Sequence, residues 1–480
     1  MRRIKSILAK NWLILTIFIA GIFLRFYNFS GFVTFLGDQG RDAIIIKRIL
    51  YGQHFPAIGA PTSVGQVYLG PFYYYFIAPW LLIFHFNPLG LAVGVAIFSC
   101  AFILINYFIV KELFDDKTAL ISSFLIAFSY VLIDLSRFSW NPNLLPLFSL
   151  LTIYFFIKAI KTGYWKFYLL FGAFLAFSIQ LHYLALSLLL PILILSLPKL
   201  FSNFLKFLGS AAIFLFFSTP LLIFDLRHQF LNTRNFLALF KESSSVKANI
   251  LKNFFDTFST LNFYIFNTKF SFWINIVLIF VIVAFLVSYV KRKKDQMFNF
   301  GLIFILSTFV LSLYSGPKYL HYLGVLYPFY LVVIAGFLAN LFNNIGEKLL
   351  IVFFLVAFVA LNYQGYTFFH GRGSDQIRTA EDVARKIFVH VDKPKYTVTG
   401  LPDKYSDSTY RYFLEIWGKA ALEKDSLEKA DELFVVCDSQ CTPIIGNPQW
   451  EIAYFAPTKI VANWKVDGVR IYELVNSESK

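Results

Sequence analysis

Charged residues are scarce in this sequence of 480 residues, at 15%, whereas 58% are apolar and 20% are aromatic. This scarcity excludes a soluble fold, because the apolar residues fall in blocks longer than a soluble core helix needs. A run of about 20 apolar residues spans the hydrocarbon core as a helix. Only helices and closed barrels satisfy every backbone polar group there, and the alternation of barrel strands is missing from these runs. The sequence therefore predicts an α-helical, polytopic membrane protein.

Familiar catalytic motifs are missing as well. The sequence has no phosphate-cradling glycine loop, no metal-spaced His/Cys cluster and no nucleophile elbow. The net charge of +15 is uneven, since residues 1–366 hold 28 Lys/Arg and 11 Asp/Glu, and residues 367–480 hold 15 and 17. Excess Lys/Arg in short loops orients a membrane protein. We therefore expect membrane lipids, and no nucleic acid, as partners.

Apolar runs predict about eleven transmembrane helices. They cover residues 12–24, 88–110, 118–136, 143–160, 166–181, 183–198, 205–224, 272–290, 298–314, 327–342 and 348–366. No small-residue cleavage site follows the first run, so we expect an uncleaved span rather than a signal peptide. Basic residues, including the run Lys291–Lys294, collect in alternate loops and predict a cytoplasmic N-terminus in a multi-pass protein of the plasma (inner) membrane.

This topology predicts two domains. Residues 1–366 form the membrane domain, and its first outer loop carries helices at Gly40–Tyr51 and Pro71–Phe86 that we expect to lie in the membrane interface. Residues 367–480 form a small extracytoplasmic α/β domain, with strands at 396–399, 433–436 and 469–474 and helices at 379–390 and 408–430. Its Cys437 and Cys441 could form a disulfide or remain free thiols, with metal binding a third alternative.

Carboxylates that fall on the outer face are few, which narrows the candidates for catalysis. They are Asp38, Asp42, Asp134, Asp225, Glu242 and Asp256. Ionisable groups near membrane depth are costly and are therefore functional candidates. Asp38 stands out because Gly37 and Gly40 flank it and would allow a ligand to approach the backbone. The alternative is that Asp38 caps the helix that follows.

Cations lie close to the same loops. Arg41 and Arg48, seven residues apart on one predicted helix, suit an anionic lipid phosphate or membrane head groups. Arg137, in the turn after the third span, could bind a phosphate or sugar, or anchor the interface beside Trp140. Asp42 is placed to pair with its neighbours.

Two other turns contain further polar residues that could bind a ligand. Lys318, His321 and Tyr322 lie in the turn Tyr314–Tyr322, where aromatic rings and a few polar groups suit a sugar or phosphate site. The alternative is an aromatic belt with a snorkelling lysine. His182 interrupts an apolar run, where it is either a ligand-binding residue or a hydrogen-bonded histidine inside the bundle.

These features resemble the GT-C superfamily of integral membrane glycosyltransferases, in its protein O-mannosyltransferase-like branch (glycosyltransferase family 39-like). That branch includes the aminoarabinose transferases and the lipopolysaccharide galacturonosyltransferases. The likeness rests on the first span, the outer loop opening with Asp38, and the Pro-aromatic segment Gly70–Pro79. The common family form is Asp-Glu, whereas this chain has Asp38-Gln39. The second acid that often follows an arginine in the second outer loop is replaced here by Asn141.

The resemblance implies a hexosyl- or pentosyl-type glycosyltransferase that uses a polyprenyl-phosphate sugar donor at the outer face. Asp38 matches the catalytic base, and Arg41, Asp42, Arg137, His182, Lys318, His321 and Tyr322 are candidates for binding the donor phosphate or sugar. The acceptor would be a glycolipid, a cell-envelope glycan or a protein. A divalent metal is possible, although the two departures from the family pattern weaken it. A transporter or flippase of lipid-linked glycans is the alternative function.

Overall fold

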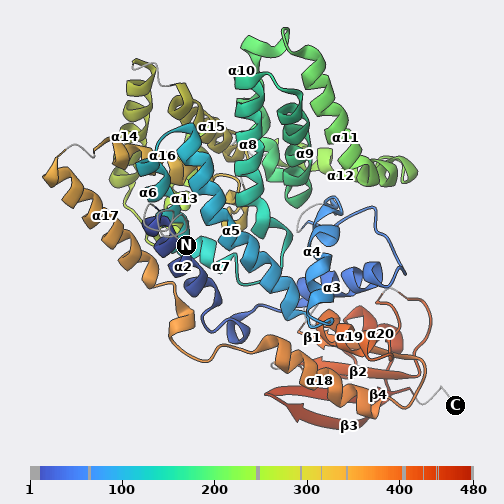
Figure 1. The fold of residues 1–480 in the computed structure, drawn as a ribbon. Helices are drawn as coiled ribbons and strands as arrows, with labels where there is room; N and C mark the ends of the chain where they lie inside the picture. The colour runs from blue at the N-terminus through green and yellow to red at the C-terminus, as the bar shows by residue number, and fades with distance from the viewer. Residues whose placement is uncertain are drawn as a thin grey trace, which may run out of the picture.

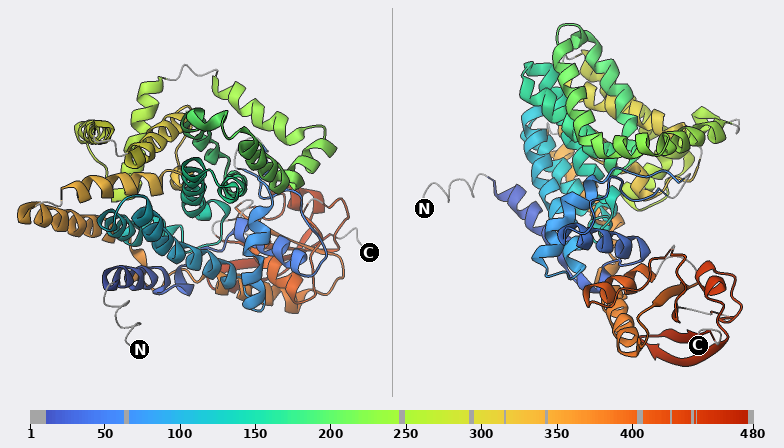
Figure 2. Two further views of the ribbon diagram at one scale, coloured as in Figure 1. Left: turned by 45° about the horizontal axis from the view of Figure 1, so that its top comes forward. Right: turned by 90° about the vertical axis from the view of Figure 1, so that its right-hand side faces the viewer.

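The computed structural model has a helical bundle and, at one end of it, a smaller part that contains the only sheet among the residues described (Figure 1). It describes residues 11–62, 66–244, 249–291, 295–314, 316–341, 344–402, 407–424, 426–438, 441 and 443–476. The right-hand view of Figure 2 shows the sheet-containing part beyond one end of the bundle. Apart from Lys291, the predicted basic run Lys291–Lys294 lies outside the described residues.

The bundle is formed by helices that follow the apolar runs. They are α2 (Trp12–Phe26), α5 (Leu89–Leu113), α6 (Asp116–Phe128), α7 (Tyr130–Asp134), α8 (Leu145–Thr162), α9 (Trp165–Leu181), α10 (Leu189–Leu200), α11 (Phe204–Arg227), α12 (Leu231–Ser244), α13 (Ile250–Phe266), α14 (Phe272–Lys291), α15 (Asp295–Ser312), α16 (Tyr327–Asn340) and α17 (Ile345–Tyr363). Short 3₁₀ segments connect some of them: η1 (Ser30–Phe32), η2 (Asn141–Leu144), η3 (Tyr183–Leu188), η4 (Leu320–Leu323) and η5 (Thr367–Phe369).

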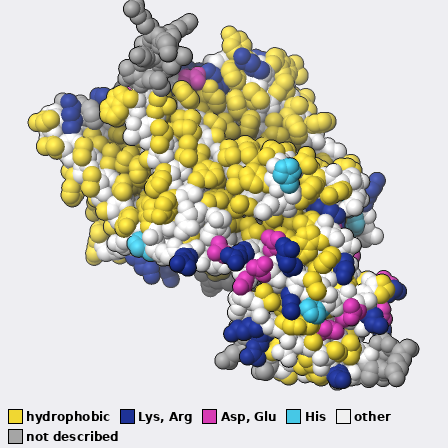
Figure 3. All heavy atoms as spheres, turned by 60° about the horizontal axis from the view of Figure 1, so that its bottom comes forward, with side chains coloured by type: hydrophobic (Ala, Val, Ile, Leu, Met, Phe, Trp, Pro, Cys, Tyr) yellow, Lys and Arg dark blue, Asp and Glu magenta, His cyan; other side chains and the backbone are white. Residues whose placement is uncertain are grey.

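Every predicted span contains a helix, but the structure does not establish eleven crossings. Among the described residues, five helical stretches are long and apolar enough to cross a membrane: Leu89–Leu113, Asn141–Thr162, Tyr183–Leu200, Phe204–Arg227 and Ile345–Tyr363. The other apolar helices are shorter, in part because the backbone breaks within or beside the runs. Ser129 is extended between α6 and α7, and His182 is extended after α9. The face of the bundle seen in Figure 3 carries mainly apolar side chains, as a lipid-facing surface requires.

The first outer loop holds two helices as predicted, α3 (Gly37–Leu50) and α4 (Phe72–Ile83). The first begins three residues earlier than predicted, so that Asp38 lies inside its first turn. The Gln39 side chain stabilises this start, because its Oε1 accepts a hydrogen bond from the Leu36 N–H at 3.0 Å. Leu36 is therefore the cap residue, and the alternative that Asp38 caps the helix is wrong.

The C-terminal part is an α/β unit, as the sequence predicts. Its elements are α18 (Gln376–His390), β1 (Tyr396–Leu401), α19 (Asp407–Ile416), β2 (Glu432–Cys437), α20 (Trp450–Phe455), β3 (Lys459–Val466) and β4 (Val469–Val475). The strand order is β1-β2-β4-β3, with β1 parallel to β2 and the other neighbours antiparallel. The Cys437 and Cys441 sulfurs are bonded, with their Cα atoms 5.9 Å apart.

Two expectations for this unit need correction. The helix expected over 408–430 ends at Ile416, and Gly418 follows with a φ of +85°, a conformation that favours glycine and stops the helix. The remaining residues form a loop that leads to β2. The sequence did not predict the strand β3 or the helix α20. The side chains of β3 alternate between exposed and partly buried, so the strand has no fully buried apolar face to mark it in the sequence.

Helix α3 is held between α4 and α19, and this contact fixes its position. At Gly40 a Cβ atom would lie 2.5 Å from the backbone nitrogen of Thr409, so the two helices touch through their backbones. The Glu415 carboxylate accepts hydrogen bonds from Lys47 Nζ at 3.2 Å and from Arg48 Nη2 at 2.8 Å. Arg48, predicted to meet lipid phosphate or head groups, is thus ion-paired within the protein.

Candidate functional site

A cavity of about 590 Å³ opens where several bundle helices end near the start of α3. Its wall is mainly apolar and carries a few polar groups, which is the usual composition of a ligand site. The loop before α4, the turn before α8, the break between α9 and α10, the helix α12 and the end of α15 all contribute. The lining residues that carry polar or aromatic groups include Asp38, Trp140, Asn141, His182, Tyr183, Ser187, Tyr314, His321 and Tyr322.

Asp38 is the one carboxylate in this lining among the described residues. It lies in the first turn of α3, where the helix dipole favours a negative charge. One oxygen, Oδ1, accepts a hydrogen bond from Arg41 Nη1 at 2.8 Å. The side chain is 44% exposed, so a ligand in the cavity can reach it.

Arg41 and Asp42 lie behind Asp38 rather than in the cavity wall. The guanidinium of Arg41 pairs with Asp42 Oδ1 at 2.7 Å as well as with Asp38. Burial lowers the pKa of Arg41, but the two carboxylates and Tyr74 outweigh it, so the pKa is raised and the cation is retained. Asp42 is fully buried and accepts a further hydrogen bond from the Tyr74 hydroxyl at 3.1 Å. The three groups fix the direction of the Asp38 side chain.

Two histidines meet in the cavity, although they lie 139 positions apart in the sequence, as their numbers show. The rings of His182 and His321 are 5.8 Å apart between centroids. Burial lowers the pKa of His182 to about 4, and burial together with His182 lowers the pKa of His321 to about 3. Both rings are therefore neutral at neutral pH. His182 Nδ1 accepts the Leu184 N–H at 3.2 Å, which leaves Nε2 as the protonated nitrogen that can donate to a ligand.

Aromatic rings surround the histidines. Trp140 packs against His321, with centroids 4.5 Å apart, and Tyr322 packs against both His182 and His321. All four side chains line the cavity. Such rings with a few donors suit the mixed apolar and hydroxylated surface of a sugar.

Asn141 and Ser187 are polar residues of the cavity that the sequence did not single out as ligands. Both are buried and line the cavity, and the Asn141 amide and the Ser187 hydroxyl have no hydrogen-bond partner within the described part of the chain. Buried polar groups in native proteins are nearly always paired. These two are therefore available to a ligand. One signal was present in the sequence, the replacement of an expected acid by Asn141.

Two further predicted cations, besides Arg41, are not among the residues that line the cavity. Arg137 is buried, and its Nη atoms donate to the carbonyl oxygens of residues 24, 25, 27 and 28 at 2.9–3.2 Å. Its guanidinium also lies 4.4 Å from the centre of the Phe368 ring. Arg137 thus binds the backbone at the end of α2 and is not among the residues that line the cavity. Lys318 is half-buried beside the cavity residues Gly316 and His321, and burial lowers the pKa of its ammonium group.

The residues of the cavity do not fit a divalent metal. Within the described ranges no group of three or more His, Cys, Asp and Glu side chains is placed to hold an ion. The described lining holds Asn141 but no carboxylate besides Asp38, and Asp38 Oδ1 is engaged by Arg41. Hard divalent cations prefer several oxygen ligands with carboxylates among them.

Comparison with known proteins gives a family match over part of the chain. Residues 69–224 match the family described as dolichyl-phosphate-mannose-protein mannosyltransferase. This range runs from the loop before α4 to α11 and includes Trp140, Asn141 and His182. Asp38 lies outside it. No curated protein sequence matches the chain.

Solved structures match the fold along nearly the whole chain. ArnT from Cupriavidus metallidurans bound to undecaprenyl phosphate is 12% identical, with a TM-score of 0.64, and the match covers 98% of this chain and 99% of that one. ArnT from the same organism in the apo state has a TM-score of 0.61 at 12% identity, and the match covers 97% of this chain and 98% of that one. The chain resembles the GT-C membrane glycosyltransferases.

A second solved structure has a longer chain. The oligosaccharyltransferase AglB from Archaeoglobus fulgidus, in complex with an inhibitory peptide and a dolichol-phosphate, is 12% identical. Its TM-score is 0.52, over 90% of this chain and 70% of that one. These matches at 12% identity show that the chain shares its fold with the solved proteins. A chemical function must be argued from the residues of the cavity.

Proposed function

We propose that this protein is a membrane glycosyltransferase that takes a sugar from a polyprenyl-phosphate donor and transfers it to an acceptor at the outer face of the membrane. The observation that carries the proposal is the cavity, which combines Asp38 with two neutral histidines and two unpaired polar groups inside an apolar wall. The matched fold supports it, because ArnT has been solved with undecaprenyl phosphate bound.

Asp38 would act as the general base. It accepts the proton of an acceptor hydroxyl while the acceptor oxygen forms a bond to the anomeric carbon of the donor sugar. The bond from this carbon to the phosphate oxygen breaks, and the polyprenyl phosphate leaves with the electron pair. Direct displacement inverts the anomeric carbon. A phosphate needs little acid assistance to leave, so one carboxylate is enough.

Other residues in and beside the cavity would bind the phosphate, the sugar and the isoprenoid chain of the donor. Arg41 pairs with the cavity residue Asp38, and Lys318 lies in the chain between the cavity residues Gly316 and His321. These two cations would stabilise the charge that develops on the phosphate. The neutral His182 and the side chains of Asn141 and Ser187 would donate to sugar hydroxyls or phosphate oxygens, since charge is not required for that role. Leucine and valine residues of η3 and α15 in the wall suit the first isoprenoid units of the donor.

The domain division and orientation belong to the same proposal. Residues 1–366 would form the catalytic membrane domain, with a cytoplasmic N-terminus in the plasma (inner) membrane. Residues 367–480 would lie outside, where a disulfide between Cys437 and Cys441 persists. The sugar is of hexosyl or pentosyl type, and the acceptor is a glycolipid, a cell-envelope glycan or a protein.

The test separates transfer from translocation. Purified protein is reconstituted in vesicles with labelled polyprenyl-phosphate sugars and candidate acceptors, and products are separated by chromatography and mass spectrometry. We expect a labelled acceptor, formed in proportion to the enzyme added. Movement of labelled donor between the leaflets, without a transferred product, would contradict the proposal and favour a flippase.

A further inference from the structure

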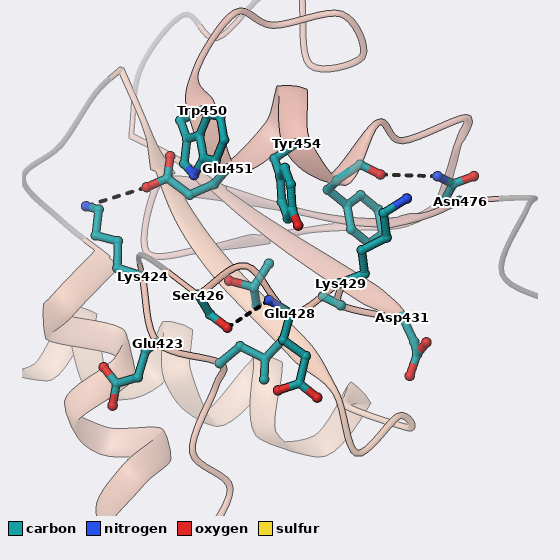
Figure 4. Close-up of a pocket in the computed structure, with 14 residues that line it drawn as sticks. Glu423, Lys424, Ser426, Glu428, Lys429, Asp431, Trp450, Glu451, Tyr454 and Asn476 are labelled. Carbon is teal, nitrogen blue, oxygen red and sulfur yellow. Dashed lines mark hydrogen bonds and ion pairs between the residues drawn. The ribbon is translucent and has the colours of Figure 1, made fainter.

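A second pocket lies in the C-terminal unit, on the surface between the loop after α19 and the helix α20. Its volume is about 260 Å³, just below the range of about 300–1,000 Å³ that is usual for small-molecule sites. It does not belong to the cavity that holds Asp38, because the two share no lining residue. Figure 4 shows it with its lining side chains.

Two aromatic side chains of α20 dominate this pocket. Trp450 and Tyr454 are one helical turn apart and their rings are nearly parallel, with centroids 5.1 Å apart and planes 19° apart. Trp450 is 54% exposed. The Tyr454 hydroxyl donates to the backbone carbonyl of Leu427 at 2.6 Å, which holds its ring against the loop. A large aromatic that is half exposed and fixed in place by its neighbour is a typical binding residue.

Polar side chains surround the rings on both sides. Figure 4 shows Glu451 and Lys424 on one flank and Lys429 and Asn476 on the other. Several of the charges are compensated within the protein, since Glu428 pairs with Lys395 at 2.6 Å and Lys424 pairs with Asp407 at 3.1 Å. The lining therefore offers many hydrogen bonds but, among the described residues, no cluster of free cations that would select an anion.

We propose that this pocket binds a sugar ring of a glycan without acidic groups. A pyranose has a face of C–H groups, which packs on an aromatic ring, and a rim of hydroxyls, which both donate and accept hydrogen bonds. The pocket supplies an aromatic surface and carboxylate, amide and ammonium groups beside it. An acidic sugar is disfavoured, because the lining includes Glu423, Glu428, Asp431 and Glu451 against Lys424 and Lys429.

The position of the pocket suggests which glycan it binds. Glu423, at its edge, pairs with Arg48 of α3 at 2.6 Å, so the pocket adjoins the helix that carries Asp38. In this respect the inference rests on the proposed function: the bound ring would be a remote sugar of the acceptor, whose binding holds the reacting hydroxyl near the cavity.

Binding can be tested without donor or turnover. Full-length protein in lipid nanodiscs is titrated with uncharged trisaccharides of glucose, mannose and N-acetylglucosamine and with a galacturonic acid trimer, and saturation-transfer NMR reports which sugar protons touch the protein. We expect at least one uncharged trisaccharide to bind through its C–H face, and the acidic trimer to bind more weakly. Absence of binding by every uncharged trisaccharide, or preference for the acidic one, would overturn the proposal.

Substitutions then locate the site. We expect Trp450→Ala to weaken saccharide binding by about tenfold or more, as loss of an aromatic contact does. Trp450→Phe keeps a ring and should retain part of the affinity, which covers the case in which the alanine variant does not fold. Trp273→Ala, at a tryptophan that is 73% exposed on the bundle, is the matched control and should bind as the parent does. Equal binding by the Trp450 and Trp273 variants would refute the site, whatever the outcome of the transfer assay.

Discussion

Asp38→Asn removes a proton acceptor from the cavity wall without changing the volume of the side chain. A general base commonly contributes a factor of about 10² to 10⁴ in rate, which corresponds to about 3 to 5 kcal/mol of activation free energy. We expect turnover to fall by this factor. The stability of the fold should change little, because the lost ion pair with Arg41 is 44% exposed on the Asp38 side and such pairs contribute about 0–1 kcal/mol.

The structure allows the effect of Asp38→Asn on turnover to be separated from its effect on the stability of the fold. Asp38 does not cap α3, so the variant keeps the hydrogen bond from Leu36 to Gln39 that begins the helix. Arg41 keeps its second partner, Asp42, and the amide oxygen of the introduced asparagine can still accept a hydrogen bond from Arg41. Loss of activity in a variant of normal thermal stability would therefore report the missing base.

The assay measures initial rates of sugar transfer in vesicles, at matched expression and with a melting curve for each variant. Asp467→Asn is the control, because Asp467 is exposed in the β3–β4 turn, where its φ of +48° is a conformation that asparagine also adopts. It should behave as the parent does. Turnover of Asp38→Asn within about threefold of the parent would refute the assignment of the base and return a transport function to first place.

Three further predictions concern the surroundings of the site. Gly40→Ala would place a methyl group 2.5 Å from the Thr409 backbone nitrogen, so we expect a loss of about 1–3 kcal/mol in stability and slower sugar transfer. Gly346→Ala is the control, because its added methyl group would lie 3.5 Å from its nearest neighbour. Equal unfolding temperatures and transfer rates for the two variants would contradict the prediction. Burial, with a second contribution from Glu473, raises the pKa of Glu432 to about 7. The stability that the protonated carboxyl contributes is therefore complete below its ordinary pKa of 4.5 and is lost as the pH rises through 7. Glu432→Gln should flatten the dependence of the melting temperature on pH between about 4.5 and 7, and an unchanged slope would contradict this prediction. Arg137→Lys loses several hydrogen bonds to carbonyl oxygens, so we expect the free energy of unfolding to fall by about 3 kcal/mol while the KM for the donor stays the same. A raised KM at an unchanged melting temperature would indicate instead that Arg137 binds the donor.

The helices of the bundle could be predicted because long apolar runs leave the backbone no alternative in lipid. Their lengths could not all be predicted, since the break at the extended Ser129 falls inside the apolar run 118–136 and depends on packing in three dimensions. The break at His182 falls between two predicted spans, and His182 lines the cavity, where its ring meets His321. The sequence identified both histidines as unusual polar residues in aromatic surroundings, but nothing in it indicated that they lie together.

Uncharged site residues were harder to predict than charged ones. Asp38 stood out because carboxylates on the outer face are few, whereas Asn141 and Ser187 are of types that occur throughout the chain. What marks them is the absence of a hydrogen-bond partner in a buried position among the described residues, and this depends on all their neighbours in space. The carbonyl partners of Arg137 could not be predicted either, because they lie more than 100 residues earlier in the chain.

In the proposed mechanism, the contact between α3 and α19 gives the C-terminal unit a part in positioning the base. Helix α3 carries Asp38 at its first turn and is held at its last turns by Lys47 and Arg48, which both pair with Glu415. Separating these largely buried pairs would leave charges without partners and cost stability, which opposes a shift of α3 along α19. A base must stay within hydrogen-bond reach of the proton it abstracts. The direction of the Asp38 side chain is therefore fixed from two sides, by Arg41 and Asp42 within α3 and by the C-terminal unit against which the whole helix is held.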